Sequence, residues 1–220
     1  MKQMKHMLCS LAGALLCVLA GAQEISTEQA VDLGLSVKWA GYNIDASSPE
    51  EYGGFYAWGE TEEKDRYDIK TYKWCKGSNR TLTKYCFDEN GFEGFQDGKR
   101  RLDPEDDVAH VKWGGNWRIP TEKEWKELIS KCTWFYMDYN GKGGFRITGP
   151  SGKSIFLPSS GCKCMLGYCQ AGTGGTYYGS TLDGISAFGC YGFYFYPGMK
   201  KPGGSGLLRE CGRTVRAVCD

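Results

Sequence analysis

The sequence predicts an α+β fold with a mixed, mostly antiparallel sheet, one well-defined helix at about residues 121–132 and long glycine-rich loops. Three observations lead to this class. One segment has the spacing of an amphipathic helix, the segment after it alternates like paired strands, and the C-terminal part is rich in glycine. Of the 32 glycines, 19 lie between Gly141 and Gly212. Glycine disfavours helix interiors and suits turns, so strands and loops are expected there.

The helix is predicted from the residues around Thr121. Thr121 and Glu124 have the spacing of a capping box, in which each side chain accepts a hydrogen bond from the other residue's backbone amide. Pro120 precedes the box, where no helical N–H is lost. The apolar residues that follow recur with helical spacing and predict one buried stripe: Trp125, Leu128, Ile129 and Cys132.

Several elements are expected before this helix. Residues 28–33 suggest a short helix, and residues 36–42 and 55–58 suggest strands. The acidic run 103–107 contains Pro104 and is interpreted as a helix start, with a cation site as the alternative. Two tryptophans, Trp113 and Trp117, flank a Gly-Gly turn and are expected to pack in the core or against loops.

After the helix the pattern predicts an antiparallel meander. Residues 133–139 are rich in aromatic side chains, and the Asn140-Gly141 pair that follows is a strong hairpin signal. Residues 145–148 and 154–157 are expected to continue the sheet. A final strand is predicted at residues 214–219.

The N-terminus has the features of a secretory signal peptide over residues 1–22. Lys2 and Lys5 precede an apolar run at 7–20 that is too short to span a membrane, and residues 20–22 read Ala-Gly-Ala, typical of a cleavage site. Residues 23–220 are expected to form one domain in the periplasm, on the outer cell surface or outside the cell. No later run is apolar enough for a transmembrane segment.

Charge and cysteine usage narrow the function classes. The net charge is +1 with scattered Lys and Arg, so no nucleic-acid partner is expected. Nine of the 11 cysteines follow the signal peptide, and export favours disulfides. Cys75 and Cys86 suggest a local disulfide-closed hairpin. Cys162, Cys164 and Cys169 match zinc-site spacing poorly, so disulfides or thiols are favoured, and neither a metal nor a cofactor is predicted.

Three segments resemble a known family. The sequence W-R-I-P-T-x-x-E-W at residues 117–125 resembles a signature of the formylglycine-generating-enzyme-like branch of the C-type-lectin fold. The longer form from Trp113, W-G-G-x-W-R-x-P-T, resembles the Fibrobacter succinogenes major paralogous domain, a family of secreted proteins common in Bacteroidetes. Residues 30–61 and 213–219 also resemble that family. The resemblance implies a C-type-lectin-like fold.

The resemblance also implies particular residues. It implies a disulfide between Cys132 at the helix end and Cys219 in the last strand. In variable proteins of diversity-generating retroelements, which share the fold, the ligand surface lies near the C-terminus, and the corresponding stretch here is about 176–213. The calcium-dependent sugar motifs of animal lectins are absent from the sequence.

The composition of residues 175–196 favours the same region. Tyrosine, glycine and serine together are typical of recognition surfaces. Strand alternation assigns Phe193 and Phe195 to the core. The predicted ligand-binding residues are Tyr177, Tyr178, Ser180, Asp183, Tyr191, Tyr194, Tyr196 and Arg209.

The sequence therefore favours a secreted, non-catalytic module that recognises an extracellular glycan or a surface protein, with the oligomeric state open. One alternative is a thiol-redox or oxidase enzyme that uses Cys164 and Cys169. A second alternative is a structural subunit of a surface appendage. Histidine-dependent hydrolase chemistry is disfavoured, because His110 is the only histidine after the signal peptide and no nucleophile-elbow motif is present. A carboxylate pair for glycoside hydrolysis stays an open alternative, because its spacing is spatial and not sequential. No catalytic residue is predicted.

Overall fold

A computed structural model describes residues 25–220, except 27, 79, 88–94 and 185–187. The expected signal peptide at 1–22 lies outside the described residues. Among the described residues, no helix has the length and apolar character needed to span a membrane.

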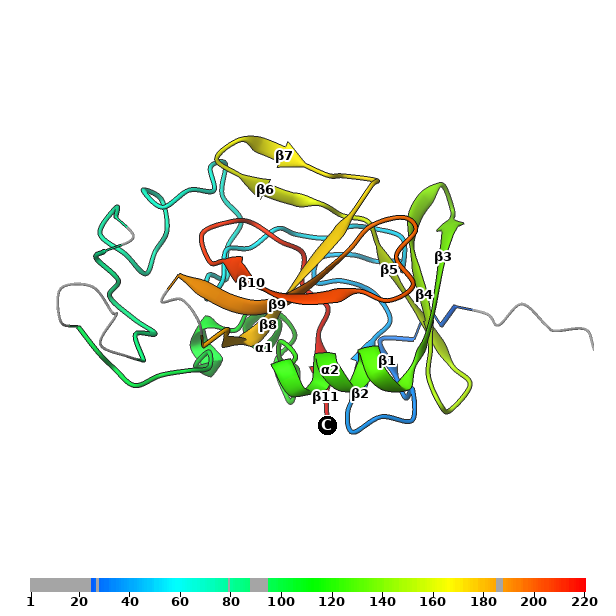
Figure 1. The fold of residues 1–220 in the computed structure, drawn as a ribbon. Helices are drawn as coiled ribbons and strands as arrows, with labels where there is room; N and C mark the ends of the chain where they lie inside the picture. Colours follow the sequence, from blue (N-terminus) through cyan, green and yellow to red (C-terminus); the bar gives the residue numbers. More distant parts are fainter. Residues whose placement is uncertain (1–24, 27, 79, 88–94, 185–187) are drawn as a thin grey trace, which may run out of the picture.

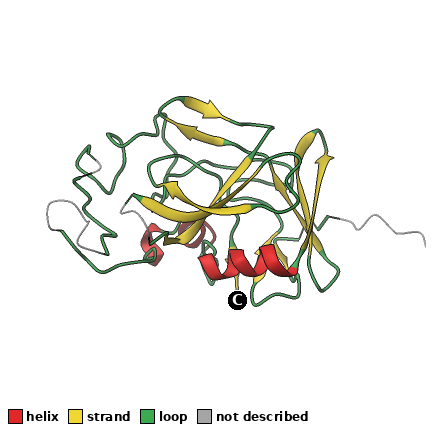
Figure 2. Cartoon of the chain, in the orientation of Figure 1, coloured by secondary structure: helices red, strands yellow, loops and turns green. Residues whose placement is uncertain are grey.

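The described chain is an α+β structure of short helices and small antiparallel sheets (Figures 1 and 2). The helical elements are η2 (Pro104–Asp106), α1 (Val108–Trp113) and α2 (Glu122–Lys131). The strands are β1 (Ala30–Val31), β2 (Lys38–Ala40), β3 (Thr133–Tyr139), β4 (Lys142–Thr148), β5 (Ser154–Pro158), β6 (Cys162–Cys164), β7 (Gly167–Cys169), β8 (Gly175–Leu182), β9 (Gly189–Phe195), β10 (Gly203–Leu208) and β11 (Val218–Cys219). Their order within the sheets is β1-β2-β11, β10-β9-β8, β3-β4-β5 and β6-β7.

Helix α2 confirms the predicted helix and its cap. Thr121 is the N-cap, the capping box with Glu124 is complete, and Cys132 is the C-cap. The Trp125 side chain is fully buried, with ring centroids 4.0 Å from Phe193 and 4.6 Å from Trp39. The helix therefore packs its apolar face against strands of two different sheets.

The meander after α2 is also confirmed. Strands β3, β4 and β5 pair in sequence order. Asn140 and Gly141 both have positive φ, of 51° and 77°, as the tight turn of a two-residue hairpin requires. The acidic run before α1 forms the expected helix start, with Pro104 opening η2 and Asp107 capping α1.

Three expectations for the edges of the fold were wrong. Residues 28–33 are not helical. Ala30 and Val31 form β1, and Val31 and Leu33 are buried on either side of an exposed Asp32, which is a period of two. At residues 55–58 only Tyr56 makes a bridge, to Arg213. The final strand is shorter than predicted, because only Val218–Cys219 (β11) pair with β2.

A buried arginine ties the C-terminal segment to the rest of the fold. Arg216 is fully buried, and among the described residues it has no ion pair. Its guanidinium donates to Asn43 Oδ1 at 2.9 Å, Ala40 O at 3.0 Å and Phe156 O at 2.9 Å. Burial lowers the pKa of Arg216 to about 10, so the side chain stays charged at neutral pH. Three neutral oxygens, from the segment 40–43 and from β5, thus solvate the charge in place of water.

We expect Arg216→Met to lower the free energy of unfolding by about 3 kcal/mol, because three buried acceptors lose a charged donor. Urea unfolding at neutral pH measures this change. Lys123→Met on the exposed side of α2 is the control and should change stability by less than about 0.5 kcal/mol. Equal effects of the two substitutions would contradict this role of Arg216.

Candidate functional site

The structure buries most of the predicted tyrosine surface. The exposed fractions of Tyr177, Tyr178 and Tyr191 are 0, 1 and 7%, and both Ser180 and Arg209 are 1% exposed. Prediction of these five as surface contacts was therefore wrong. The expected core positions of Phe193 and Phe195 are confirmed.

The reason is that β8 is covered on both faces. Tyr177 packs in a core with Trp125 and Phe193, whereas Tyr178 packs in a second core with Trp58 and other residues. The polar tips are satisfied internally, because the Tyr177 hydroxyl donates to Pro158 O at 2.9 Å and the Tyr178 hydroxyl to Cys211 O at 2.6 Å. Alternation along a strand identifies a surface only when one face meets water.

Arg209 is internal for a related reason. Its Nη2 atom donates to Tyr85 O at 3.0 Å, and its guanidinium lies 5.1 Å from the centre of the Trp58 ring. An arginine stacked on a buried indole contributes to packing as well as to charge.

The other predicted contacts are only partly exposed. Tyr194 and Tyr196 lie side by side with ring centroids 5.8 Å apart. Asp183 instead lines a groove of about 450 Å³ beside α2, which also includes Tyr191 and Lys126. The predicted residues therefore do not converge on one site.

Neither expected disulfide is formed in the structure. Cys132 lies in the core, where burial raises the pKa of its thiol to about 11. The Cys75 thiol donates to Ile69 O at 2.9 Å, while Cys86 is buried in the same small core. The thiols that do meet are those of Cys164 and Cys169, whose sulfurs are 3.5 Å apart.

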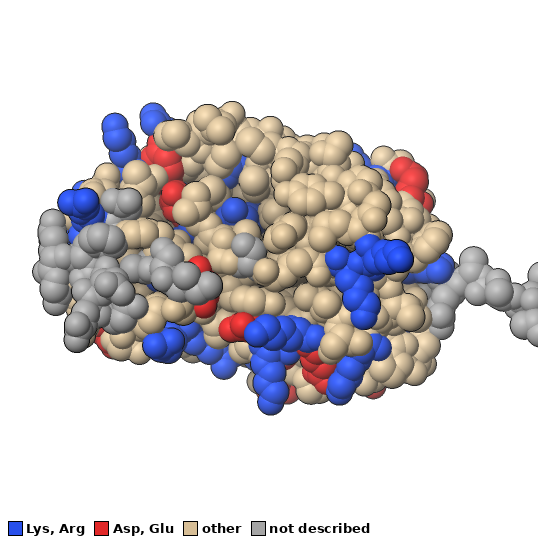
Figure 3. All heavy atoms as spheres, viewed as in Figure 1, with Lys and Arg blue, Asp and Glu red and all other residues tan. Residues whose placement is uncertain are grey.

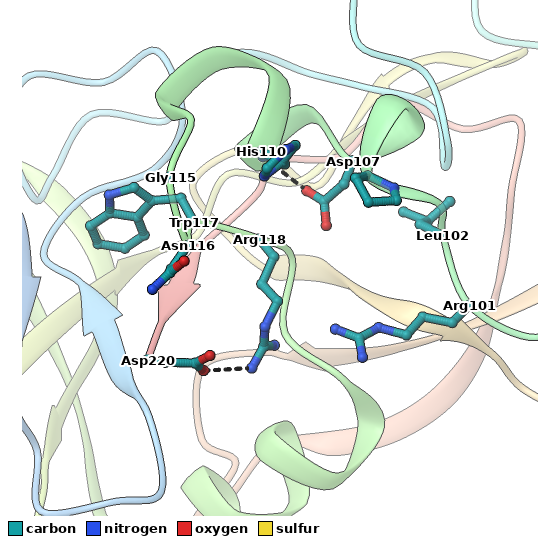
Figure 4. A pocket seen from close by; sticks show the side chains of 10 residues that line it. Arg101, Leu102, Asp107, His110, Gly115, Asn116, Trp117, Arg118 and Asp220 are labelled. Atoms are coloured by element: carbon teal, nitrogen blue, oxygen red, sulfur yellow. Dashed lines mark hydrogen bonds and ion pairs between the residues drawn. The ribbon is translucent and has the colours of Figure 1, made fainter.

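A polar cavity of about 420 Å³ lies elsewhere, between α1, the start of α2 and the C-terminal strand (Figure 4). We call it the arginine pocket. Its lining residues are Arg101, Leu102, Pro104, Asp107, His110, Gly115, Asn116, Trp117, Arg118 and Asp220. In Figure 4, Arg101 extends toward Arg118 across the cavity, while Asn116 and Trp117 lie on the far side from Arg101.

Backbone pairing brings the two arginines together. Leu102 N donates to Ser180 O at 3.0 Å, which fixes the segment of Arg101 along β8. Ser180 N donates to Pro120 O at 2.8 Å. Arg118 itself exchanges two backbone hydrogen bonds with Val218. Ser180 therefore contributes to this pocket through its backbone and not as a ligand contact.

Asp107 holds the pocket's wall in place. Its carboxylate accepts from the amides of Ala109 and His110, which caps α1, and from Ile119 N at 2.8 Å. Burial raises the pKa of Asp107, although these three backbone amides oppose the rise. The residue therefore has a structural role, since its oxygens are occupied by the protein itself.

The two arginines differ in their partners. Arg118 forms a two-pronged ion pair with Glu124, at 2.8 and 2.6 Å, and reaches Asp220 at 3.3 Å. Arg101 has no ion pair with any described residue, although it lines the same cavity. A planar guanidinium without a counter-ion is suited to a carboxylate or sulfate group.

The nearby acidic cluster already contains a cation. Oxygens of Asp103, Glu105 and Asp106 lie within 4.8 Å of one another. The Lys84 ammonium is 2.6 Å from both Asp103 and Asp106 and 3.5 Å from Glu105. Burial alone would lower the pKa of Lys84, but the hydrogen bonds to these carboxylates raise it. Lys73 also pairs with Asp106 and Lys99 with Asp103, so three lysines balance the three carboxylates of this structural element.

Sequence reasoning missed the arginine pocket. It gave Arg101 no role, considered His110 only as a candidate for hydrolase chemistry, and treated Trp117 only as a packing residue. The signal that was available is the succession of Asn116, Trp117 and Arg118 within one short motif. Comparisons with protein-family models, with curated proteins and with solved structures find no match for this chain.

The ion pair at the pocket floor predicts a pH dependence of stability. Burial alone would raise the pKa of Glu124, but hydrogen bonds from Arg118 and Thr121 outweigh it and lower the pKa below 4.5. A carboxyl group whose pKa is lowered by folding stabilises the fold at pH values above its pKa in the unfolded chain. This contribution is lost as the pH falls through the pKa of the group in the folded protein.

We therefore expect Glu124→Gln to cost about 1 kcal/mol of unfolding free energy at pH 7 and less as the pH falls below about 4. Urea unfolding of both proteins across this range measures the difference. A difference that stays constant with pH would mean that the charge of Glu124 does not stabilise the fold. Glu62→Gln, in an exposed loop, is the matched control.

Proposed function

We propose that this chain is a secreted, non-catalytic binding module whose arginine pocket takes the anionic end of an extracellular glycan. The observation that carries the proposal is the Arg101 guanidinium, which lines a cavity and has no ion pair with a described residue. The cavity volume, about 420 Å³, is in the usual range for small-ligand sites.

The other lining groups suit a sugar acid better than a simple ion. Asn116 offers both a hydrogen-bond donor and an acceptor for hydroxyl groups, and the His110 imidazole offers a further polar contact. Trp117 is half-buried and supplies an apolar ring beside these polar groups. A carboxylated or sulfated sugar presents the matching combination of an anionic group, hydroxyls and C–H faces.

Charged side chains of the described residues form no continuous basic surface on the face shown in Figure 3. On the face in Figure 3, lysine and arginine side chains stand beside acidic ones, and a broad area between them is uncharged. General attraction of polyanions would require a continuous basic face. We therefore propose recognition of one anionic group rather than coating of a long polyanion.

The C-type-lectin-like arrangement and export belong to the same proposal. Helix α2 packed against antiparallel strands supports the fold. The signal peptide expected at residues 1–22 supports the compartment, because a glycan on a cell surface or in the medium is accessible only to an exported protein.

The test is binding to an array that contains uronic-acid, sialylated, sulfated and neutral glycans. We expect binding to acidic glycans that weakens as salt is raised. Arg101→Gln should lower the affinity about tenfold or more, because a charge-assisted hydrogen bond is worth about 1.5–3 kcal/mol.

Lys200→Gln provides a matched control, because it removes one positive charge from an exposed residue outside the pocket. It should leave the affinity within about twofold of the unsubstituted chain, as expected of a screened surface charge. Equal binding of neutral and acidic glycans would refute the proposal, as would an Arg101→Gln variant that binds as tightly as Lys200→Gln.

A further inference from the structure

A second cluster of reactive side chains lies outside the arginine pocket, on the β6–β7 hairpin. This two-stranded arm, yellow in Figure 1, lies along one edge of the molecule. Cys162 pairs with Cys169 across the hairpin, and Cys164 pairs with Gly167. Because side chains two apart along a strand, and those directly opposite, share a face, all three thiols are on one face of the arm.

Two of these thiols already touch. The sulfurs of Cys164 and Cys169 are 3.5 Å apart, and both residues are partly exposed. A disulfide has a sulfur–sulfur bond of about 2.05 Å, so an approach of about 1.5 Å would close it.

The arm is held so that this contact persists. Lys163 and Gly212 exchange two backbone hydrogen bonds of 2.8 Å, which fix β6 to the C-terminal segment. On the other strand, the Tyr168 hydroxyl donates to Ser160 O at 2.8 Å, and its ring packs against Phe55. Both strands are therefore anchored on either side of the thiol pair.

We propose that Cys164 and Cys169 form an oxidative modification site, which a disulfide oxidant converts into a disulfide across the β6–β7 hairpin. The two thiols lose two protons and two electrons as the Cys164–Cys169 sulfur–sulfur bond forms. The oxidant's own sulfur–sulfur bond accepts the two electrons and two protons and breaks into two thiols. The inference does not depend on the arginine pocket.

The geometry distinguishes this site from a metal centre. A site for zinc would bring at least three ligand atoms from cysteine, histidine or carboxylate side chains around one point. Among the described residues, the only group of three such ligand atoms within 4.8 Å of one another is the acidic cluster that holds Lys84. The third thiol, Cys162, is therefore on the same face without joining the contact.

The electrostatics also distinguish it from a catalytic dithiol. The hydrogen bond with Cys164 raises the pKa of the Cys169 thiol, and burial adds to the rise. Redox catalysts depend on a lowered thiol pKa, because the thiolate is the attacking species. The raised pKa lowers the thiolate fraction of Cys169 at neutral pH, so oxidation of the pair should accelerate as the pH rises.

The modification would lock an exposed turn. Met165 and Leu166 at the tip of the arm are 73 and 84% exposed. The disulfide would close the chain on both sides of this tip, so a single cut there would leave the two strands covalently joined.

The experiment is oxidation of the folded full chain with oxidised glutathione, followed by alkylation in denaturant and peptide mapping by mass spectrometry. We expect one peptide pair joined through Cys164 and Cys169. Cys164→Ser and Cys169→Ser should each lose this pair, whereas Cys162→Ser, the control from the same face, should keep it.

A joined pair of Cys162 and Cys169 in the unsubstituted chain would overturn the proposal, as would complete alkylation of Cys164 and Cys169 after oxidation. A second measurement is independent of the variants. After limited chymotrypsin cleavage at the tip, the fragments of the oxidised chain should migrate together on a denaturing gel and separate only after reduction. Separation without reduction would equally contradict the proposal.

Discussion

The fold depends on the burial of one indole ring. Trp125 projects from α2, lies against Trp39 of β2 and Phe193 of β9, and donates from its ring nitrogen to Tyr178 O at 3.0 Å. A single side chain therefore contacts the sheet that holds both β1 and β11 and the sheet that holds β8. Because aromatic side chains contribute large buried areas, the position of α2 fixes the relative position of these sheets. The capping box sets where the helix begins and hence where the ring points.

The second constraint is the double burial of β8. Neighbouring residues Tyr177 and Tyr178 pack in separate cores, so β8 lies between the two cores and neither of its faces is an outer surface. A strand used in this way cannot offer its side chains to a ligand. Its backbone is still available at the end near Ser180, where it holds the segment of Arg101 on one side and Pro120 on the other. The proposed binding pocket therefore lies among the loops that β8 positions and not among the β8 tyrosines.

Features that depend on residues close in the chain were predictable from the sequence, whereas sites formed by long-range contacts were not. The capping box at Thr121, the turn at Asn140-Gly141 and the Pro104 helix start depend on residues close in the chain, and all three are confirmed. The prediction of a tyrosine surface was wrong, because sequence periodicity gives the spacing of side chains but does not show whether a second layer covers the outer face of the strand. The arginine pocket was missed because Arg101 and Arg118 meet only through hydrogen bonds to β8 and β11. Paired thiols at Cys164 and Cys169 were visible as a spacing, but their contact required the hairpin.

The ammonium of Lys84 among three carboxylates has a consequence for the conditions in which the protein can work. Many extracellular loops are organised by calcium and lose their shape when the ion is chelated or diluted. Here the organising cation is part of the chain, so its local concentration is independent of the medium. The loop that carries Asp103 and leads into α1 therefore keeps its counter-charge in calcium-poor and calcium-rich surroundings alike. This loop supplies Pro104 and Asp107 to one wall of the arginine pocket, so the shape of that wall does not depend on a bound metal ion.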